Sequence, residues 1–328
     1  MKLRFDHFLT TILSNRAYFL LVLMILVMVI MSSISPYFFH LDSLLNMTRF
    51  GAVLALVAMG QSLVILAGGA GIDLSVGAIL SLSGVLFGFL VKMGVNIWPA
   101  SILGVLIGAG LGAVNGITIA WWGIPPLIGT LGTMWAYSAI ALVLTQVPVS
   151  GFPPEFAFLA EGRILNIPTQ ILLVVLPAFL ILQYMTSRTM FGRWIYLIGV
   201  NDQAARFAGV PVVRVRFLLY TLSGLLSGLG AVVMSSWLMA ARPDVGTGME
   251  LQSITVAVLG GVDIFGGLGS IAGVILAVLI VTMVASGLQL ANINTIWQLA
   301  VLGFILLGAV ALNQVLAQRT VRMQGLSS

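Results

Sequence analysis

The sequence contains no cysteine and very little charge. Without a thiol among its 328 residues, disulfide bonds and cysteine chemistry are excluded. Only 7% of the residues are charged, whereas a soluble domain carries about 25%. Such a chain cannot cover a surface that faces water, so the composition predicts an integral membrane protein.

Further absences narrow the chemistry. The two histidines, His7 and His40, lie far apart, which argues against a histidine metal site. The motif G-x-x-x-x-G-K-[ST], which would cradle the phosphates of ATP, is missing. A credible pair of nucleophile and base is missing too, so we expect no enzyme, no metal and no cofactor. The net charge of +5 is small and scattered, which argues against nucleic acid as a partner.

Apolar segments make up most of the chain. A helix that crosses a bilayer needs roughly 20 apolar residues. The approximate candidates are residues 17–36, 50–67, 72–91, 98–121, 126–146, 168–185, 216–238, 251–262, 269–288 and 295–315. The eighth is too short to cross alone, so we expect it to be tilted, extended or broken. The predicted fold class is an all-α integral membrane protein of about ten transmembrane helices with glycine-rich breaks, in one domain over residues 1–328.

The basic residues predict the orientation. With the N-terminus inside, ten of them fall on the cytoplasmic side and four on the other. The first set is Lys2, Arg4, Arg16, Arg188, Arg193, Arg206, Arg214, Arg216, Arg319 and Arg322. The second set is Arg49, Lys92, Arg163 and Arg242. Because basic residues favour the cytoplasmic side, we expect both termini to be cytoplasmic.

Glycine is abundant, with 37 residues, and many lie inside the predicted spans. Examples are Gly108, Gly110 and Gly112 in the fourth span and Gly224 and Gly228 in the seventh. Small residues let membrane helices approach closely. We therefore expect tight helix packing at these positions.

Two glycine pairs, each followed by an aspartate, interrupt the apolar pattern. They are Gly68, Gly69, Asp73 and Ser75 in GGAGIDLSVG, and Gly260, Gly261 and Asp263 in GGVD. Aspartate suits a helix N-cap, and glycine adopts backbone angles that other residues avoid. We therefore expect Asp73 to cap a helix at a glycine-permitted break that contributes to an inner gate. Direct contact with a solute and a proton relay are the alternatives.

The longest cytoplasmic segment, about residues 186–215, predicts a short helix. Asn201 or Asp202 suits its N-cap, and Gly209 suits the position after its end. Four arginines of this segment and Arg216 directly after it surround an apolar patch. The patch consists of Ala204, Ala205, Phe207 and Ala208. Because a helix of about two turns is not stable alone, we expect a partner surface, with a plain surface turn as the alternative.

Five stretches, in order along nearly the whole chain, resemble the motifs of ribose-type sugar ABC permeases. They are GGAGIDLSVG from Gly68, NGITIAWWGIPPLIGTLGTM from Asn115, FGRWIYLIGVNDQAARFAGV from Phe191, ARPDVGTGMELQSITVAVLGGVDIFGGLGS from Ala241 and WQLAVLGFILLGAV from Trp297. The departures from the family pattern are the additional Ala70 and Gly71, Leu127 in place of phenylalanine, and Asp263 in place of serine or threonine.

The resemblance implies the transmembrane subunit of an ATP-driven importer for a monosaccharide or sugar-like solute, in the bacterial inner membrane. It implies a separate ABC ATPase, a solute-binding protein, and a second permease copy or a related permease as partners, besides the lipid bilayer. The short helix would couple to the ATPase through Asn201, Asp202, Ala204, Ala205, Arg206 and Gly209. Because the binding protein usually docks by an acidic face, the docking candidates are Arg242, Arg49 and Arg163.

Two alternative functions stay open: a branched-chain amino-acid-type ABC permease and a stand-alone secondary sugar transporter. The stretches LGTM and ARPDVGTG favour the sugar permease over the amino-acid permease. The scarcity of charge within the spans argues against ion coupling, and the coupling segment argues against a carrier that works alone. The predicted pore lining is apolar and rich in glycine and carries little specificity for one sugar.

Overall fold

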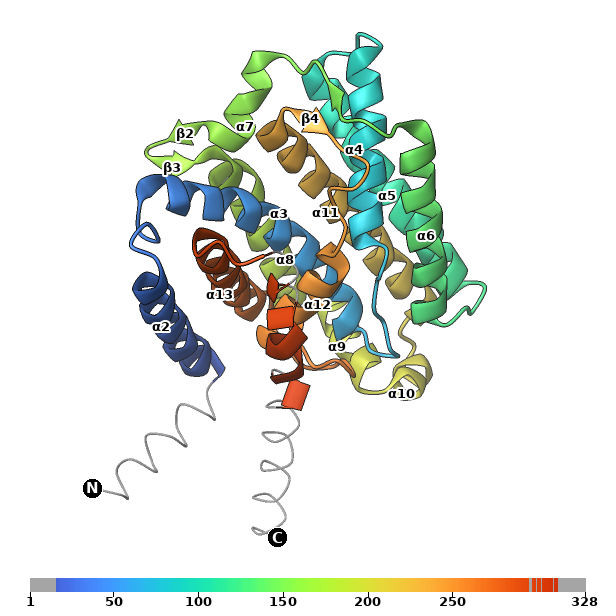
Figure 1. Cartoon of the computed structure of the whole chain (residues 1–328). Coiled ribbons are helices and arrows are strands. Elements are labelled where there is room, and N and C mark those ends of the chain that lie inside the picture. The colour runs from blue at the N-terminus through green and yellow to red at the C-terminus, as the bar shows by residue number, and fades with distance from the viewer. Residues whose placement is uncertain (1–15, 295–296, 299, 302, 309, 312–328) are drawn as a thin grey trace, which may run out of the picture.

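The computed structural model describes residues 16–294, 297–298, 300–301, 303–308 and 310–311, which form a bundle of helices (Figure 1). The longer helices are α2 (Arg16–Ile34), α3 (Leu41–Leu66), α4 (Val76–Lys92), α5 (Ile97–Ala120), α6 (Pro126–Leu144), α8 (Leu176–Arg188), α11 (Val212–Leu238) and α13 (Ile271–Leu290). The shorter elements are η1 (Pro154–Ala157), α7 (Phe158–Glu161), the π-helical turn η2 (Ile171–Val175), α9 (Met190–Val200), α10 (Asp202–Phe207) and α12 (Met249–Leu259).

Very short strands lie at one end of the bundle (Figure 1). They are β1 (Val149–Ser150), β2 (Arg163–Ile164), β3 (Ile167–Pro168) and β4 (Ala240–Ala241). Strand β1 pairs antiparallel with β4, and β2 pairs antiparallel with β3. Helices α9 and α10 lie at the opposite end. We call these two ends the strand end and the α10 end.

The predicted helical membrane fold is confirmed. Among the described residues, fewer helices than the predicted ten meet the length and hydropathy expected of a membrane span. In the described part of the chain, six helices are long and apolar enough to cross a membrane. They are Leu41–Leu66, Ile97–Ala120, Pro126–Leu144, Ile171–Arg188, Val212–Leu238 and Ile271–Leu290. Every predicted segment from 17–36 to 269–288 contains a helix, and α12 is as short as expected. The number ten stays a prediction, and the two termini lie outside the described residues.

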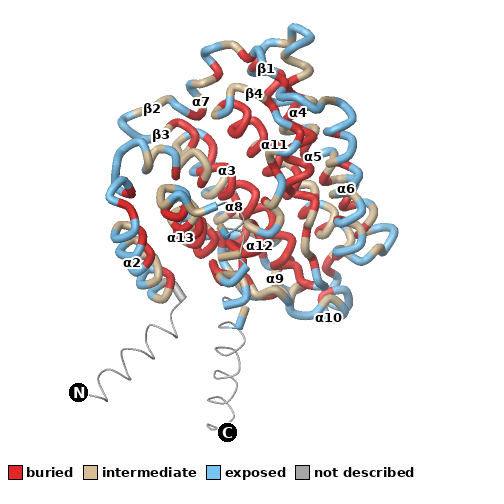
Figure 2. Tube along the Cα trace, viewed as in Figure 1, coloured by how far each residue is buried: buried red, intermediate tan, exposed pale blue. Residues whose placement is uncertain are grey.

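Helix α3 forms the centre of the bundle. Each of its residues from 51 to 66 is buried, and it packs against α11, α12 and α13. The tube in Figure 2 is accordingly red along residues 51–66 of α3 and largely blue along α2 and α6. The outer helices expose large apolar side chains, such as Ile25 in α2 and Trp135 in α6. This arrangement suits a protein whose outer surface contacts lipid and whose centre contacts only protein.

Helices α5 and α11 approach each other along their glycines, as the sequence predicts. A Cβ atom on Gly112 would lie 2.9 Å from Gly224 Cα, and a Cβ atom on Gly108 would lie 2.7 Å from Gly228 Cα. Atoms at these distances overlap, so no side chain fits there. Gly110 is different, because a Cβ atom there would meet nothing within 4 Å.

This difference provides a matched test of the α5–α11 interface. We expect Gly112→Leu to lower the free energy of unfolding by about 1–3 kcal/mol or more, since the new side chain has to push α11 away. Gly110→Leu has the same change of residue on an exposed face of the same helix, and we expect it to be neutral. Thermal melting of the detergent-purified variants measures both. Equal melting temperatures for the two would contradict the proposed packing.

Candidate functional site

The short helix α10 forms where the sequence predicts it. The Asn201 side chain caps its start, because its Oδ1 accepts a hydrogen bond from the Ala204 N–H at 2.9 Å. At its end, Gly209 has a φ of 80°, and its N–H donates to the Arg206 carbonyl at 3.0 Å. The Val210 N–H donates to the Ala205 carbonyl at 3.0 Å, which completes a Schellman motif. Both ends of α10 are therefore fixed by local hydrogen bonds.

Only part of the predicted apolar patch on α10 is accessible. Ala205 is 3% exposed and packs into the core of the bundle, so its side chain faces the protein itself, and its role in coupling stays a prediction. Ala204 and Ala208 are exposed. Phe207 is 92% exposed, which leaves a large aromatic ring in solvent. The exposed face is therefore built around Phe207, a residue of the predicted patch that was not among the coupling candidates.

The segment before α10 is a second helix that the sequence analysis did not predict. Helix α9 begins after Thr189, whose hydroxyl accepts a hydrogen bond from the Gly192 N–H at 3.2 Å. It packs against α3, α8 and α10. The threonine before an apolar run was the available signal for this helix. The segment 186–215 is thus two consecutive helices that are joined at Asn201.

The two glycine breaks, predicted separately, meet each other and the end of α9. A Cβ atom on Gly68 would lie 2.9 Å from Gly199 Cα in α9 and 2.9 Å from the Phe265 carbonyl oxygen. The Gly267 N–H donates to the Leu66 carbonyl at 2.9 Å, so the second break bonds directly to the end of α3. The α10 end therefore contains one junction of three backbone segments that pack without side chains between them.

The backbone of the breaks partly follows the prediction. Gly68, Gly69 and Gly261 have φ values of 65°, 64° and 105°, as expected for glycines that permit a turn. Gly260 has an ordinary φ of −67°. A Cβ atom there would lie 2.7 Å from the Gly273 backbone, so this glycine serves close packing of α12 on α13.

Asp73 lies in a buried cluster of hydrogen bonds rather than at the N-cap of a helix. Helix α4 starts at Val76, and the N-cap residue is Ser75, whose side chain makes no capping hydrogen bond. Asp73 Oδ1 instead accepts from the Ser75 N–H at 3.0 Å and from the Ser75 hydroxyl at 2.6 Å. Its Oδ2 accepts from the Ser223 hydroxyl of α11 at 3.0 Å. The carboxylate therefore connects its own loop to α11.

Two more helices complete this cluster. Asn115 Nδ2 of α5 donates to Ser75 Oγ at 2.6 Å. With its amide oriented so that both groups find partners, Gln61 of α3 donates to the Asp73 carbonyl at 2.9 Å and accepts from the Asp73 N–H at 3.1 Å. These side chains are all buried. Four separate parts of the chain are thus held together through Asp73, which we call the Asp73 cluster.

Asp263 has a more local role than predicted. Its Oδ1 accepts from the Phe265 N–H at 2.9 Å, which stabilises the turn between α12 and α13. The N-cap of α13 is Ser270, whose hydroxyl accepts from the Gly273 N–H at 3.1 Å. The two aspartates are therefore not equivalent, since Asp263 is partly exposed and Asp73 is fully buried.

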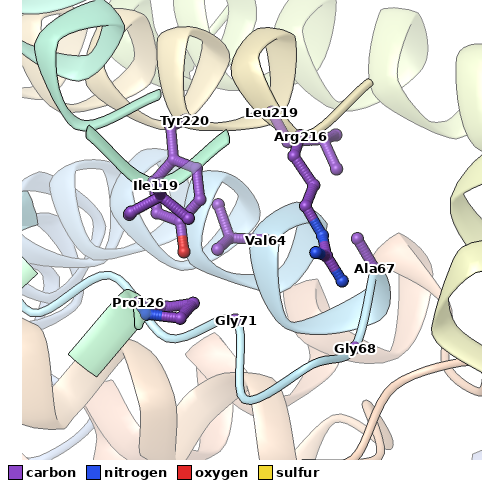
Figure 3. A pocket seen from close by; sticks show the side chains of 9 residues that line it. All are labelled: Val64, Ala67, Gly68, Gly71, Ile119, Pro126, Arg216, Leu219 and Tyr220. Carbon is purple, nitrogen blue, oxygen red and sulfur yellow. The ribbon is translucent and has the colours of Figure 1, made fainter. Parts of the chain in front are cut away.

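Arg216 connects α10 to the first glycine break. Its Nη1 lies 3.7 Å from Asp202 Oδ2 in α10. A Cβ atom on Gly69 would lie 2.6 Å from its Nη2, so the guanidinium also contacts the break. Figure 3 shows Arg216 and Tyr220 extending from α11 into a small cavity beside Gly68 and Gly71. This cavity, of about 10 Å³, has room for roughly one water molecule.

The sequence predicts Arg216 to be one of the cytoplasmic arginines and does not predict this contact. Its position at the first residue of a predicted span was the available signal, because a basic residue there needs a partner or water.

The side chains of the three predicted docking arginines differ in their ion pairs and hydrogen bonds. Arg242 pairs with Asp244 through two hydrogen bonds of 3.1 and 3.0 Å, and these lower the pKa of the Asp244 carboxyl. Arg49 is held by Glu161 of α7 at 3.6 Å and by Asn46 at 2.9 Å. Arg163 in β2 is exposed. Of the three, Arg49 is the one fixed as a brace between α3 and the strand end.

Comparison with known proteins gives a consistent picture. The family described as "Branched-chain amino acid transport system / permease component" matches residues 43–310. The ribose import permease protein RbsC of Bacillus subtilis (strain 168) is 40% identical over 292 residues, which cover 88% of this chain and 90% of that protein. The D-allose transport system permease protein AlsC of Escherichia coli (strain K12) is 36% identical over 296 residues, 89% of this chain and 90% of that protein.

A third relative has a different solute in its name. The autoinducer 2 import system permease protein LsrD of Photorhabdus laumondii subsp. laumondii is 34% identical over 295 residues, 88% of each chain. No solved structure matches the sequence.

The Asp73 cluster can be tested by two substitutions at one position. Asp73→Ala removes the acceptor for the Ser75 and Ser223 donors, and each buried group left unpaired costs about 1–3 kcal/mol. Asp73→Asn keeps the Oδ1 acceptor, and its new NH2 group can donate to the Ser223 oxygen. We expect a large loss of thermal stability for the alanine variant and a small loss for the asparagine variant.

Asp263→Ala is the control, since it removes one hydrogen bond from a partly exposed turn. Melting curves of the three purified variants decide the point. An Asp73→Ala protein as stable as Asp263→Ala would show that the cluster does not hold the helices together.

Proposed function

The chain belongs to the permease-component family of the branched-chain amino acid transport systems, and on this basis we propose that it is the transmembrane subunit of an ATP-driven ABC importer for a monosaccharide or sugar-like solute. The curated relatives carry the argument, because permeases named for ribose, allose and autoinducer 2 are 34–40% identical over nearly the whole chain. The solute would be delivered by a binding protein, and ATP would be hydrolysed by a separate subunit. The protein would reside in the bacterial inner membrane.

The proposal includes an orientation and a number of spans. We place the α10 end in the cytoplasm and the strand end outside, with about ten spans and both termini inside. The basic residues of the described chain favour this orientation by six to four. Arg16, Arg188, Arg193, Arg206, Arg214 and Arg216 lie on elements or helix ends toward the α10 end, whereas Arg49, Lys92, Arg163 and Arg242 lie toward the strand end. Such a bias favours the more basic end as the cytoplasmic one.

We propose that the ATPase docks on the exposed face of α10 and that Arg216 carries the movement inward. Phe207, Ala204 and Arg206 are accessible to the ATPase, while Asn201 and Gly209 fix the ends of the helix. A shift of α10 would act on Arg216 through Asp202, and from there on the glycine break next to the Asp73 cluster. Since the break has little side-chain packing, it can change its path while the helices move as rigid bodies.

The alternative of an ion-coupled secondary transporter requires a different role for the buried Asp73. A proton-coupled carrier needs an ionisable group that can bind and release a proton in the path. Both oxygens of Asp73 are already occupied by hydroxyl and N–H donors from the protein. This supports a structural carboxylate over an ion-carrying one. The branched-chain amino-acid alternative is supported by the description of the family and opposed by the solutes in the names of the relatives reported above.

At the strand end, the solute-binding protein would contact the exposed basic residues. Arg163 is the stronger candidate for an acidic partner, because the charge of Arg242 is partly neutralised by Asp244. A second copy of the chain, or a related permease, would complete the path.

The function is tested by uptake into vesicles that contain the chain, its ATPase and its binding protein. We expect ATP-dependent accumulation of D-ribose or D-allose and none of leucine. Accumulation without the ATPase would establish a secondary transporter, and ATP-dependent accumulation of leucine would establish an amino-acid permease.

Docking on α10 is tested by Phe207→Asp. A charge in the centre of an apolar contact should prevent association, so we expect at least a tenfold loss of ATPase that copurifies with the chain. Leu165→Asp is the matched control, because Leu165 is 89% exposed at the strand end. If both variants retain the ATPase equally, α10 is not the docking site.

The role of Arg216 is tested by Arg216→Met, with Arg214→Met as control. Arg214 lies two residues away on the same helix and is exposed. We expect Arg216→Met to bind the ATPase normally and to lose most of its ATP-driven uptake, since docking remains while the contact to the glycine break is gone. Normal ATP-driven uptake by Arg216→Met would show that Arg216 does not take part in coupling.

A further inference from the structure

A second cavity, of about 690 Å³, lies between α3, α11, α12 and α13. It is lined by residues near the start of α3 and near the ends of α11 and α13, all of which lie toward the strand end. Ligand pockets of proteins have about 300–1,000 Å³. This cavity is therefore large enough for a small organic solute, whereas the cavity at Tyr220 is not.

The cavity is lined by amide and aromatic side chains. The main groups are Asn46, Phe50, Trp237, Gln252, Gln289 and Gln298. An amide both donates and accepts hydrogen bonds, as does each hydroxyl of a sugar, and an aromatic ring provides an apolar face. The described lining contains no Lys, Arg, Asp or Glu. This combination suits a neutral molecule with several hydroxyl groups.

Gln252 supplies the most specific indication. Its Oε1 is buried and has no hydrogen-bond partner among the described residues. A buried acceptor without a partner costs about 1–3 kcal/mol. Gln252 lines the cavity, while its Oε1 atom has almost no accessible surface of its own. A ligand hydroxyl would satisfy this oxygen once the amide turns toward the cavity.

Neighbouring hydrogen bonds prepare other amides for a ligand. Arg49 donates to Asn46 Oδ1 at 2.9 Å, so the NH2 group of Asn46 is the part left to donate. Gln298 Nε2 donates to the Ile293 carbonyl at 2.9 Å, so its oxygen is the part left to accept. The lining thus offers both donors and acceptors from fixed side chains.

A zwitterionic amino acid fits this cavity less well. Its carboxylate would need a cation or a free helix N-terminus. The start of α12, next to Gln252, already faces a carboxylate, because the Gly248 N–H donates to Glu250 Oε1 at 3.2 Å. That carboxylate would repel a second one.

We propose that this cavity is a low-affinity subsite for a neutral sugar, with Gln252 as hydrogen-bond acceptor and Trp237 as apolar platform. The assignment rests on the proposed function and deepens it by naming residues that contact the solute inside the permease. It also accounts for the lack of charge in the lining, since a neutral site binds weakly and releases easily.

The test measures sugar binding directly. The chain is placed in nanodiscs without its ATPase or binding protein, and saturation-transfer NMR is recorded with D-ribose, D-allose and leucine. We expect transfer to the sugar that the vesicle experiment shows to be imported, and none to leucine. Gln252→Leu and Trp237→Leu should reduce the transfer by about fivefold, which corresponds to the loss of one hydrogen bond or one apolar contact.

Gln183→Leu is the matched control. Gln183 in α8 also has a buried Oε1 without a partner among the described residues, but it does not line the cavity. We expect this variant to bind sugar like the unchanged chain. Melting curves of all variants show whether each is folded. If Trp237→Leu does not fold, Trp237→Phe replaces it in the binding measurement, because it keeps an aromatic ring.

The outcomes separate the two proposals. If the vesicles import a sugar while the unchanged chain shows no transfer to it, or while Gln252→Leu binds it equally well, the subsite is overturned and the importer function stands. If the vesicles accumulate the solute without the ATPase, or accumulate leucine with ATP, the proposed function fails and the subsite falls with it.

Discussion

The structure depends on one buried carboxylate. Asp73 lies in a loop without regular structure at the centre of an apolar bundle, where an unpaired charge would be very costly. Its oxygens are satisfied by Ser75 and Ser223, and its backbone is satisfied by Gln61. A loop at this depth can persist only if its polar groups find partners in the protein. The Asp73 cluster meets that condition and fixes where α4 begins.

This constraint leaves a defined place for movement. On one side of the loop the hydrogen bonds tie Asp73 to three helices, so that part is rigid. On the other side, Gly68 packs on Gly199 through backbone atoms alone, and the exposed Gly69 contacts the side chain of Arg216. Displacement of α10 would therefore be taken up in the glycines rather than in the cluster. Under the proposed function, an inner gate at this place would open by bending beside a fixed point, which is typical of hinged motions.

The position of α10 could be predicted from the sequence because the residues that fix its ends act locally. The caps of α10 depend on Asn201 and Gly209, which act within a few residues of themselves, so the helix could be located without a structure. The partners of Asp73 are different, since Ser223 is 150 residues away, and sequence alone suggested a local cap. The burial of Ala205 and the exposure of Phe207 likewise depend on which face of α10 packs against the bundle. The Arg216 contact and the cavity at Gln252 arise only from tertiary packing.

The buried polar groups of the protein fall into two sets with different roles along the proposed solute path. In the Asp73 cluster, polar side chains are bonded to one another and hold the backbone. Toward the strand end, amide side chains such as that of Gln252 line the second cavity, and the Gln252 Oε1 has no hydrogen-bond partner among the described residues. A permease that receives its solute from a binding protein needs little affinity of its own, because tight binding inside the membrane would slow release. Uncharged amides supply weak and exchangeable contacts of about 0.5–1.5 kcal/mol each, which is the strength that such a site requires.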